Sequence, residues 1–168
     1  MASTIRELII LEIIARAAVI RHVASPASGY ETDIGETVLR ARPRVDPAEL
    51  PCCVVWPQPE TAENLHGHSR HKMPVKVEGL ALFGAENPSV VAERILGDLI
   101  KCFTSQTWDR RRLIVGSSPV AYADPYIESI VYQSGGIDTA LEDGSLSVGV
   151  PALFLVTYDT AIGNPCAQ

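Results

Sequence analysis

The sequence lacks the patterns that usually mark enzyme chemistry or a nucleic-acid surface. It has no Cys-x-x-C pair, so neither a zinc ribbon nor a thiol redox motif is indicated. It has neither G-x-G-x-x-G nor G-x-x-x-x-G-K-S/T, the glycine-rich patterns that hold phosphate groups. A net charge of −6 argues against a surface that grips nucleic acid, because phosphate binding needs a clustered excess of Lys and Arg.

Long uninterrupted apolar runs are also missing. The chain starts MASTIRELIILEIIARAAVIRHV, and Arg6, Glu7, Glu12 and Arg16 interrupt its apolar residues. A membrane span needs roughly 20 mostly apolar residues, and a secretory signal needs an unbroken apolar core followed by a cleavage site. We therefore expect a soluble protein that is made in the cytoplasm and does not contact a membrane.

The chain has enough apolar material for one globular core, since 46% of its 168 residues are hydrophobic and 20% are charged. We expect a single domain over residues 1–168, with a loose tail from about residue 160. Cys52 and Cys53 are neighbours in an apolar run, so their side chains should point to opposite faces of a strand. We interpret these two residues, Cys102 and Cys166 as reduced, mostly buried thiols.

Two helices are predicted. The first covers residues 3–24, where Thr4 and Glu7 suit a capping box and helical spacing is followed by Ile5, Leu8, Ile9, Ile13, Ala17 and Ile20. It is apolar on more than one side, so it is either covered by its own sheet and a neighbouring subunit or is a deep core helix. The second begins with Asn87 as N-cap and Pro88 as first residue, ends near Ser105, and buries Val91, Ile95, Leu99 and Cys102 or Phe103.

Strands fill most of the remaining chain. The first half predicts a half-exposed strand at 37–42, a proline-punctuated turn, an apolar strand at 52–56 that should be central in its sheet, a mobile loop at 57–72 and a strand at 73–83. The second half predicts strands at 127–132 and 147–159, joined by a glycine-rich hairpin loop at 134–146. The expected fold is α+β, a mainly antiparallel sheet with two helices packed on one face.

Three histidines, His66, His68 and His71, raise the question of a metal site because histidine is a common metal ligand. A metal site needs a rigid scaffold and supporting hydrogen bonds, whereas this segment is polar and flanked by prolines. We interpret it as a solvated loop.

Other candidate sites are weaker. The serine-rich turn at 115–120 lacks the strand-turn-helix context of a catalytic serine, because Pro119 blocks the helix start. Glu142 and Asp143 suit a solvated turn better than acid–base work or calcium binding. Gly135, Gly136 and Gly144 suit the same hairpin. We therefore predict no catalytic, cofactor-binding or metal-ligating residues, and a protein that is not an enzyme.

The run Arg110–Arg112 has three interpretations. It is a solvated helix end that offsets the helix dipole, a contact to DNA phosphate, or a docking contact to another subunit. In an acidic protein we favour docking over DNA contact.

Several segments together resemble the tail terminator (minor tail) proteins of long-tailed phages. TVLRARPRVDPAELPCCVVW at 37–56 is similar to a basic strand, a "DP-x-x-LP" turn at Asp46–Pro51 and an apolar strand. PETAE, MPVKVEG at 73–79 and ENPSVVAERILGDLIKCF at 86–103 resemble the loop, strand and helix that follow. SVGVPALFLVTYDT resembles a final strand ending in Val156-Thr157-Tyr158. The stretch 106–126 and the histidine-rich loop depart from the pattern.

The resemblance implies a structural virion protein that forms a homohexameric ring on the head-proximal end of the tail tube. Such a ring stops tube polymerisation and presents a docking surface to the neck, so the implied partners are other copies of the chain, the tail tube protein and a neck or head-completion protein. The strands at 37–42 and 147–159 offer edges for pairing, and the loops at 57–72 and 134–146 offer docking surfaces. An acidic lumen would let genome DNA pass without specific binding.

Three alternatives stay open. A head–tail connector of the same particle would have a similar size and fold class and would also assemble into a ring. A bacterial gene-transfer particle or contractile injection particle would contain the same kind of subunit. A small metal-dependent hydrolase is the remote alternative, and zinc lost on mutation of His66 and His68 would support it.

Overall fold

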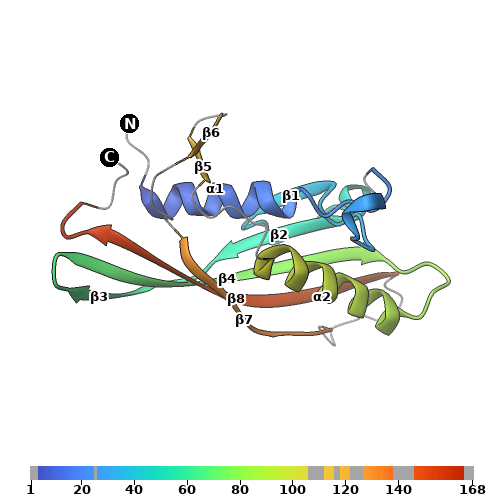
Figure 1. Ribbon diagram of the computed structural model, residues 1–168. Helices are drawn as coiled ribbons and strands as arrows, with labels where there is room; N and C mark the ends of the chain where they lie inside the picture. The colour runs from blue at the N-terminus through green and yellow to red at the C-terminus, as the bar shows by residue number, and fades with distance from the viewer. Residues whose placement is uncertain are drawn as a thin grey trace.

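A computed structural model describes residues 4–24, 26–105, 112–115, 118–121, 127–137 and 146–164. Side chains are described for all of these except residues 26, 112–115 and 118–121. The chain forms a long twisted sheet with two helices against it, as Figure 1 shows. Among the described residues, no helix is long and apolar enough to span a bilayer.

The main sheet has five strands side by side in the order β1-β2-β4-β8-β7, and β3 pairs with the free side of β4 beyond β2. β1 and β2 are parallel, whereas all other neighbours in this sheet are antiparallel. The expected α+β class with a mainly antiparallel sheet is confirmed. The bounds are β1 Thr37–Arg40, β2 Cys52–Pro57, β3 Thr61–Leu65, β4 His68–Leu82, β7 Ile127–Gly135 and β8 Ser147–Ala161.

Both helices lie on the same face of this sheet (Figure 1), as predicted. α1 spans Ile5–Ala17 and α2 spans Pro88–Thr104. Side chains alternate across each strand, so every second residue of β4 and β8 meets the helices. The resulting core includes Ile9, Ile95, Leu99, Val75, Val77, Phe154 and Val156, each no more than 2% exposed.

The first helix is shorter than predicted, since it ends at Ala17 and not at residue 24. Backbone groups beyond it are taken by the segment that follows. Asp33 Oδ1 accepts hydrogen bonds from the His22 and Val23 amides at 2.8 and 2.9 Å, and the Gly35 amide donates to Ile20 O at 3.0 Å. These non-local bonds replace the helical ones, while Ile20 still enters the core at 0% exposed.

The predicted features of the second helix are confirmed. Asn87 Oδ1 accepts from the Ser89 amide at 2.9 Å, Pro88 is the first helical residue and Ser105 is the C-cap. The predicted face is buried, and both Cys102 and Phe103 belong to it. The strand 52–56 is also interior, because β2 lies between β1 and β4.

The predicted loop at 57–72 is wrong. Thr61–Leu65 forms β3, and β4 starts at His68, five residues before the predicted strand. A two-residue turn joins the strands, and Gly67 there has a φ of +86°, a conformation that glycine adopts at little cost. The polar sequence predicted a loop because this hairpin contacts little of the apolar core. Its strands are held by backbone hydrogen bonds, which leave no apolar pattern in the sequence.

The closing strands are longer than predicted. β7 continues to Gly135 and β8 to Ala161, and they form the expected antiparallel hairpin. Thr160, expected at the start of a loose tail, is 7% exposed within β8. A small unpredicted sheet pairs β5 Arg112–Val115 with β6 Ser118–Ala121.

Candidate functional site

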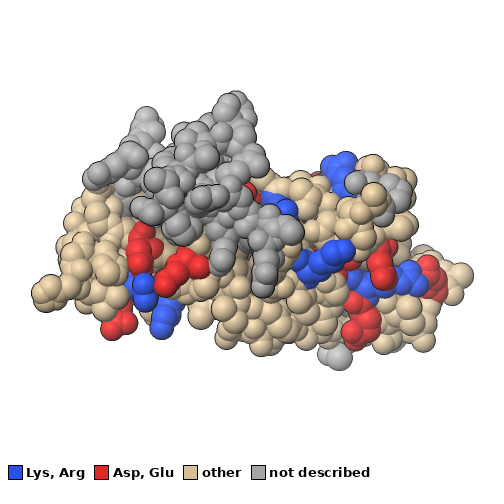
Figure 2. Space-filling view, viewed as in Figure 1, with Lys and Arg blue, Asp and Glu red and all other residues tan. Residues whose placement is uncertain are grey.

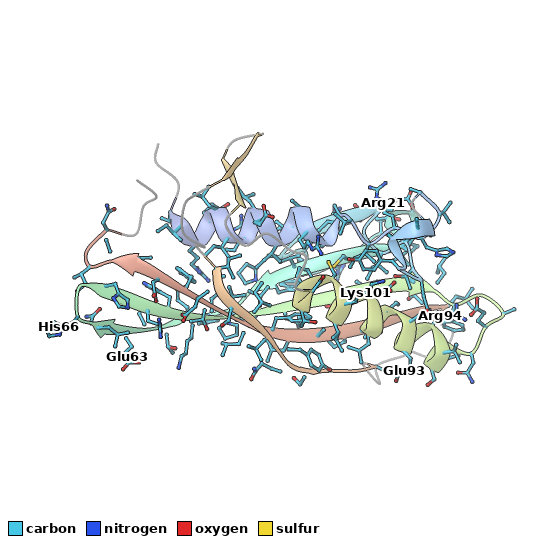
Figure 3. All side chains as sticks on the ribbon, in the orientation of Figure 1. Arg21, Glu63, His66, Glu93, Arg94 and Lys101 are labelled. Carbon is cyan, nitrogen blue, oxygen red and sulfur yellow. The ribbon has the colours of Figure 1, made fainter. Side chains whose placement is uncertain are left out.

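The three histidines do not converge. His66 lies at the exposed tip of the ribbon formed by β3 and the start of β4, as Figure 3 shows. His68 Nε2 is 3.6 Å from Asp159 Oδ2, whereas His71 stacks on the Tyr158 ring with centroids 4.8 Å apart. Nowhere in the described ranges do three His, Cys, Asp or Glu side chains gather in a group able to hold a metal.

His71 instead joins a polar cluster around Glu60. The Tyr158 hydroxyl donates to Glu60 Oε2 at 2.7 Å, and Arg6 Nε lies 3.3 Å from the same oxygen. Burial, followed by the bond to Glu60, raises the pKa of Tyr158. The cluster borders a cavity of about 260 Å³ and ties the chain between β2 and β3 to the start of α1.

This cluster is the nearest approach to catalytic geometry that we find among the described side chains. His71 Nε2 lies 2.9 Å from Thr160 Oγ1, and His71 Nδ1 lies 3.5 Å from Glu60 Oε1. A hydroxyl, an imidazole and a carboxylate in this order suit a nucleophile and its base. However, 3.5 Å is too long for a good hydrogen bond, and Glu60 is already held by Tyr158 and Arg6. We interpret the cluster as a structural anchor.

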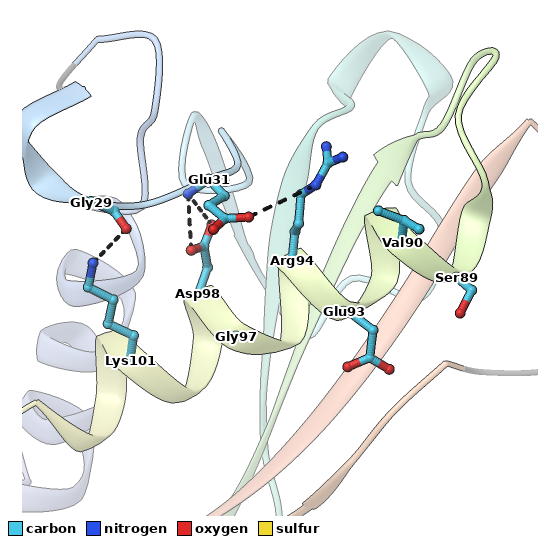
Figure 4. A pocket seen from close by; sticks show the side chains of 9 residues that line it. All are labelled: Gly29, Glu31, Ser89, Val90, Glu93, Arg94, Gly97, Asp98 and Lys101. Carbon is cyan, nitrogen blue, oxygen red and sulfur yellow. Dashed lines mark hydrogen bonds and ion pairs between the residues drawn. The ribbon is translucent and has the colours of Figure 1, made fainter.

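A groove of about 590 Å³ runs along α2, and Figure 4 shows its lining. Its floor is Asp98, 3% exposed, which accepts from the Glu31 and Thr32 amides at 3.0 and 2.8 Å and from the Thr32 hydroxyl at 2.6 Å. Lys101 donates to Gly29 O at 2.6 Å. These groups hold the segment before β1 against α2, so their hydrogen bonds are engaged within the chain.

Asp98 was missed by sequence reasoning. The available signal was its position, since an acidic residue directly before Leu99 and three residues after Ile95 falls on the apolar face of α2. A buried carboxylate needs hydrogen-bond partners, and the loop amides supply them.

On the face of the sheet opposite the helices, β4, β8 and β7 carry half-buried and exposed side chains. We call this face the open face. It carries Lys76 and Glu78 on β4, Leu153 and Leu155 on β8 and Val131 on β7, the last 48% exposed. A hollow of about 550 Å³ lies on it beside Pro151, Leu153 and Ile137. Cys52 also points to this side but is fully buried beside Glu49, and burial raises the pKa of its thiol to about 11.

The outer strands β1 and β7 have no further strand beyond them in the described part of the chain. The edge predicted at 37–42 is therefore present at β1, whereas the edge predicted at 147–159 is wrong, because β8 pairs with β4 on one side and with β7 on the other. Such edges expose unpaired amides and carbonyls that can pair with another chain. β1 stops after four residues at Ala41, whose φ is +46°, and β7 is bent by register shifts near Glu128 and Gln133. These irregularities restrict pairing to strands of matching shape.

Charge is mixed over the surface. On the side drawn in Figure 2, Lys and Arg lie intermixed with Asp and Glu. The acidic lumen expected from the net charge stays a prediction. Of the other sequence candidates, Arg112 starts β5 and Ser118 starts β6, whereas Arg110, Arg111, Ser117, Glu142, Asp143 and Gly144 lie outside the described residues.

Three of the four cysteines are described, and Cys52, Cys53 and Cys102 are free and buried, as predicted. Cys53 belongs to the helix-covered core and Cys52 lies on the other side of β2, so the alternation expected for neighbours is present. Cys166 lies outside the described residues.

The chain matches no protein-family model, and no curated protein sequence matches it significantly. What the described residues show is an α+β fold in which buried polar side chains hold neighbouring segments together and one face of the sheet stays exposed.

Proposed function

We propose that the protein is a structural subunit of a tailed-phage particle that caps the head-proximal end of the tail tube, stops its polymerisation and offers a docking surface to the neck. The observation that carries the proposal is the sheet itself. Its helices cover one face only, and its outer strands β1 and β7 have no partner strand among the described residues. A ring subunit needs two different patches that meet head to tail, and two dissimilar strand edges supply them.

The projecting ribbon adds a second kind of surface. β3 pairs with residues 68–72 of β4, and the end of β8 pairs with the same stretch. In Figure 1 this end of the sheet reaches beyond α1, and four of the five β3 residues are exposed. A stiff ribbon of this kind is suited to reach a tube or neck protein.

The sequence resemblance supports the same proposal. The Asp46–Pro51 segment forms a compact 3-10 turn in which Asp46 and Glu49 cap each other's backbone amides. The turn returns the chain from β1 to the parallel strand β2. The final strand, which carries Val156, Thr157 and Tyr158, is the 15-residue β8, which lies between β4 and β7 in the sheet.

Electron microscopy of the purified protein mixed with purified tail tubes tests the proposal. A terminator forms rings at one end of the tubes and fixes their length. Tubes that stay uncapped and keep growing would contradict the proposal. Binding to the portal side of DNA-filled heads, with no effect on tubes, would identify a connector instead.

The DNA passage is tested separately. Affinity of the assembled ring for double-stranded DNA should be negligible and independent of salt, because phosphate contacts impose a steep salt dependence. Tight, salt-sensitive binding would contradict an inert lumen.

A further inference from the structure

The open face has a charge pattern that suits a second copy of the same face. Lys76 and Glu78 are two residues apart on β4, so both project from this face, and their Nζ and Oε2 atoms are 3.3 Å apart. Consider two copies whose open faces face each other, related by a two-fold axis. The axis lies midway between the two sheets, perpendicular to the strands, at the level of Val77. This axis places Lys76 of one copy opposite Glu78 of the other. The same axis repeats the contact in reverse, which is the property of an isologous interface.

The neighbouring strand fits the same axis. On β8, Leu153 is level with Lys76 and Pro151 is level with Glu78, so the axis sets Leu153 against Pro151 of the other copy. The hollow beside Pro151 then receives that leucine. Large side chains thus face smaller ones.

The next rows follow the same rule. Leu155 is level with Pro74 and Gly149 is level with Leu80, so Leu155 faces the other copy's Gly149. A Cβ added at Gly149 would meet only Glu78 Oε1, at 3.5 Å, which leaves room above this residue.

The area is sufficient for a weak, specific pair. Three strands about 4.8 Å apart, paired over about ten residues of roughly 3.3 Å each, give roughly 650 Å² per copy with their flanking side chains. The total of about 1,300 Å² lies in the lower part of the range for stable protein–protein interfaces. Facing sheets pack about 10 Å apart, which is within reach of a lysine and a glutamate that extend toward each other.

We propose that the free protein forms a two-fold dimer through its open face, with Lys76 of each copy paired to Glu78 of the other. This dimer does not depend on the proposed tail function, because a head-to-tail ring would use the strand edges and not this face.

Sedimentation and light scattering of the purified chain test the dimer. We expect a dimer mass with a Kd on the order of 10 µM. Glu78→Lys should weaken it at least tenfold, because Lys76 then faces a lysine at both symmetric contacts. Lys76→Glu should do the same, and the double variant K76E/E78K should restore the dimer because opposite charges face each other again. Glu93→Lys, the same charge change at an exposed position of α2, should leave it unchanged.

Cross-linking gives a second measurement that does not depend on charge. The double variant Gly149→Cys/Leu155→Cys should form a covalent dimer on mild oxidation, whereas each single variant should not, because position 149 faces 155 and not itself. A monomer up to about 100 µM would overturn the proposal. A dimer indifferent to both charge reversals, or a folded charge-swapped variant that stays monomeric, would overturn it as well.

Discussion

β4 and β8 present two different faces with the same backbone ladder. On the helix-covered face their residues alternate as Val75, Val77, Phe154 and Val156, none more than 2% exposed. On the open face the intervening residues include Lys76, Leu153 and Leu155, all half-buried. The difference separates two roles, because burial against the helices stabilises the fold while the open face keeps apolar and charged groups available for contact.

The largest test of this difference compares neighbours on β8. Phe154→Ala should cost about 3–5 kcal/mol, because its ring contacts Phe103 and Tyr132 at centroid distances of 5.1 and 5.8 Å and a cavity would remain. Leu155→Ala on the open face should cost about 1 kcal/mol or less. Urea unfolding at low protein concentration measures both without a contribution from pairing. Equal losses would remove the distinction between the faces.

A polar test on the covered side should come next in size. Asp98→Ala should cost about 2–3 kcal/mol, because it leaves the Glu31 and Thr32 amides and the Thr32 hydroxyl without their carboxylate acceptor. Glu93→Ala, at an exposed position of the same helix, should change the free energy of unfolding by no more than about 0.5 kcal/mol. Hydrogen exchange at residues 31 and 32 should accelerate only in the Asp98 variant. Unchanged exchange there would show that Asp98 does not hold this segment.

The spacing of apolar residues predicted the helix-covered face well, because residues that are buried on one side of a helix or strand must recur at its period. Helical spacing found the buried side of α2, with Val91, Ile95 and Leu99, and its cap at Asn87, since both depend on residues close in sequence. The helical residues predicted beyond Ala17 are not helical, because Asp33, ten residues from Val23, takes amides that a longer helix would use. The local spacing of residues does not reveal that a distant carboxylate competes for these amides.

The ribbon and the Glu60 cluster escaped prediction for a related reason. β3 is held by backbone pairing to β4, and its exposed side chains carry no apolar alternation. His71 and Tyr158 are 87 positions apart and meet only because β4 and β8 pair in one register. The sequence showed three neighbouring histidines but not that one of them points to the covered side and another to the open face.

Alkaline pH provides a smaller test of the covered side. Burial raises the pKa of the Cys102 thiol to about 11. The folded state therefore keeps a proton that the unfolded state loses near pH 8.5–9. The contribution is complete below the unfolded pKa and is lost as the pH rises to about 11, so the free energy of unfolding should fall by about 1–2 kcal/mol over this window. Cys102→Ala should remove the Cys102 share of this fall in urea titrations, while the share from Cys52 and Cys53, whose pKa values burial also raises, should remain. A fall of the same size in that variant would assign it to other groups.

The smallest expected effect compares one ion pair on each face. Arg40 Nη1 and Nη2 donate to Glu7 Oε1 and Oε2 at 2.6 and 2.8 Å, which joins β1 to α1, and the bond from Arg40 lowers the pKa of Glu7. Lys76 and Glu78 form a local pair within one strand. Both pairs are half-exposed, so solvent screens them. Glu7→Gln should cost about 0.5 kcal/mol and Glu78→Gln about 0.2 kcal/mol in dilute unfolding experiments, both less in high salt. A larger loss for Glu78→Gln in the monomer would mean that the open face also stabilises the fold, and its role could no longer be assigned to contact alone.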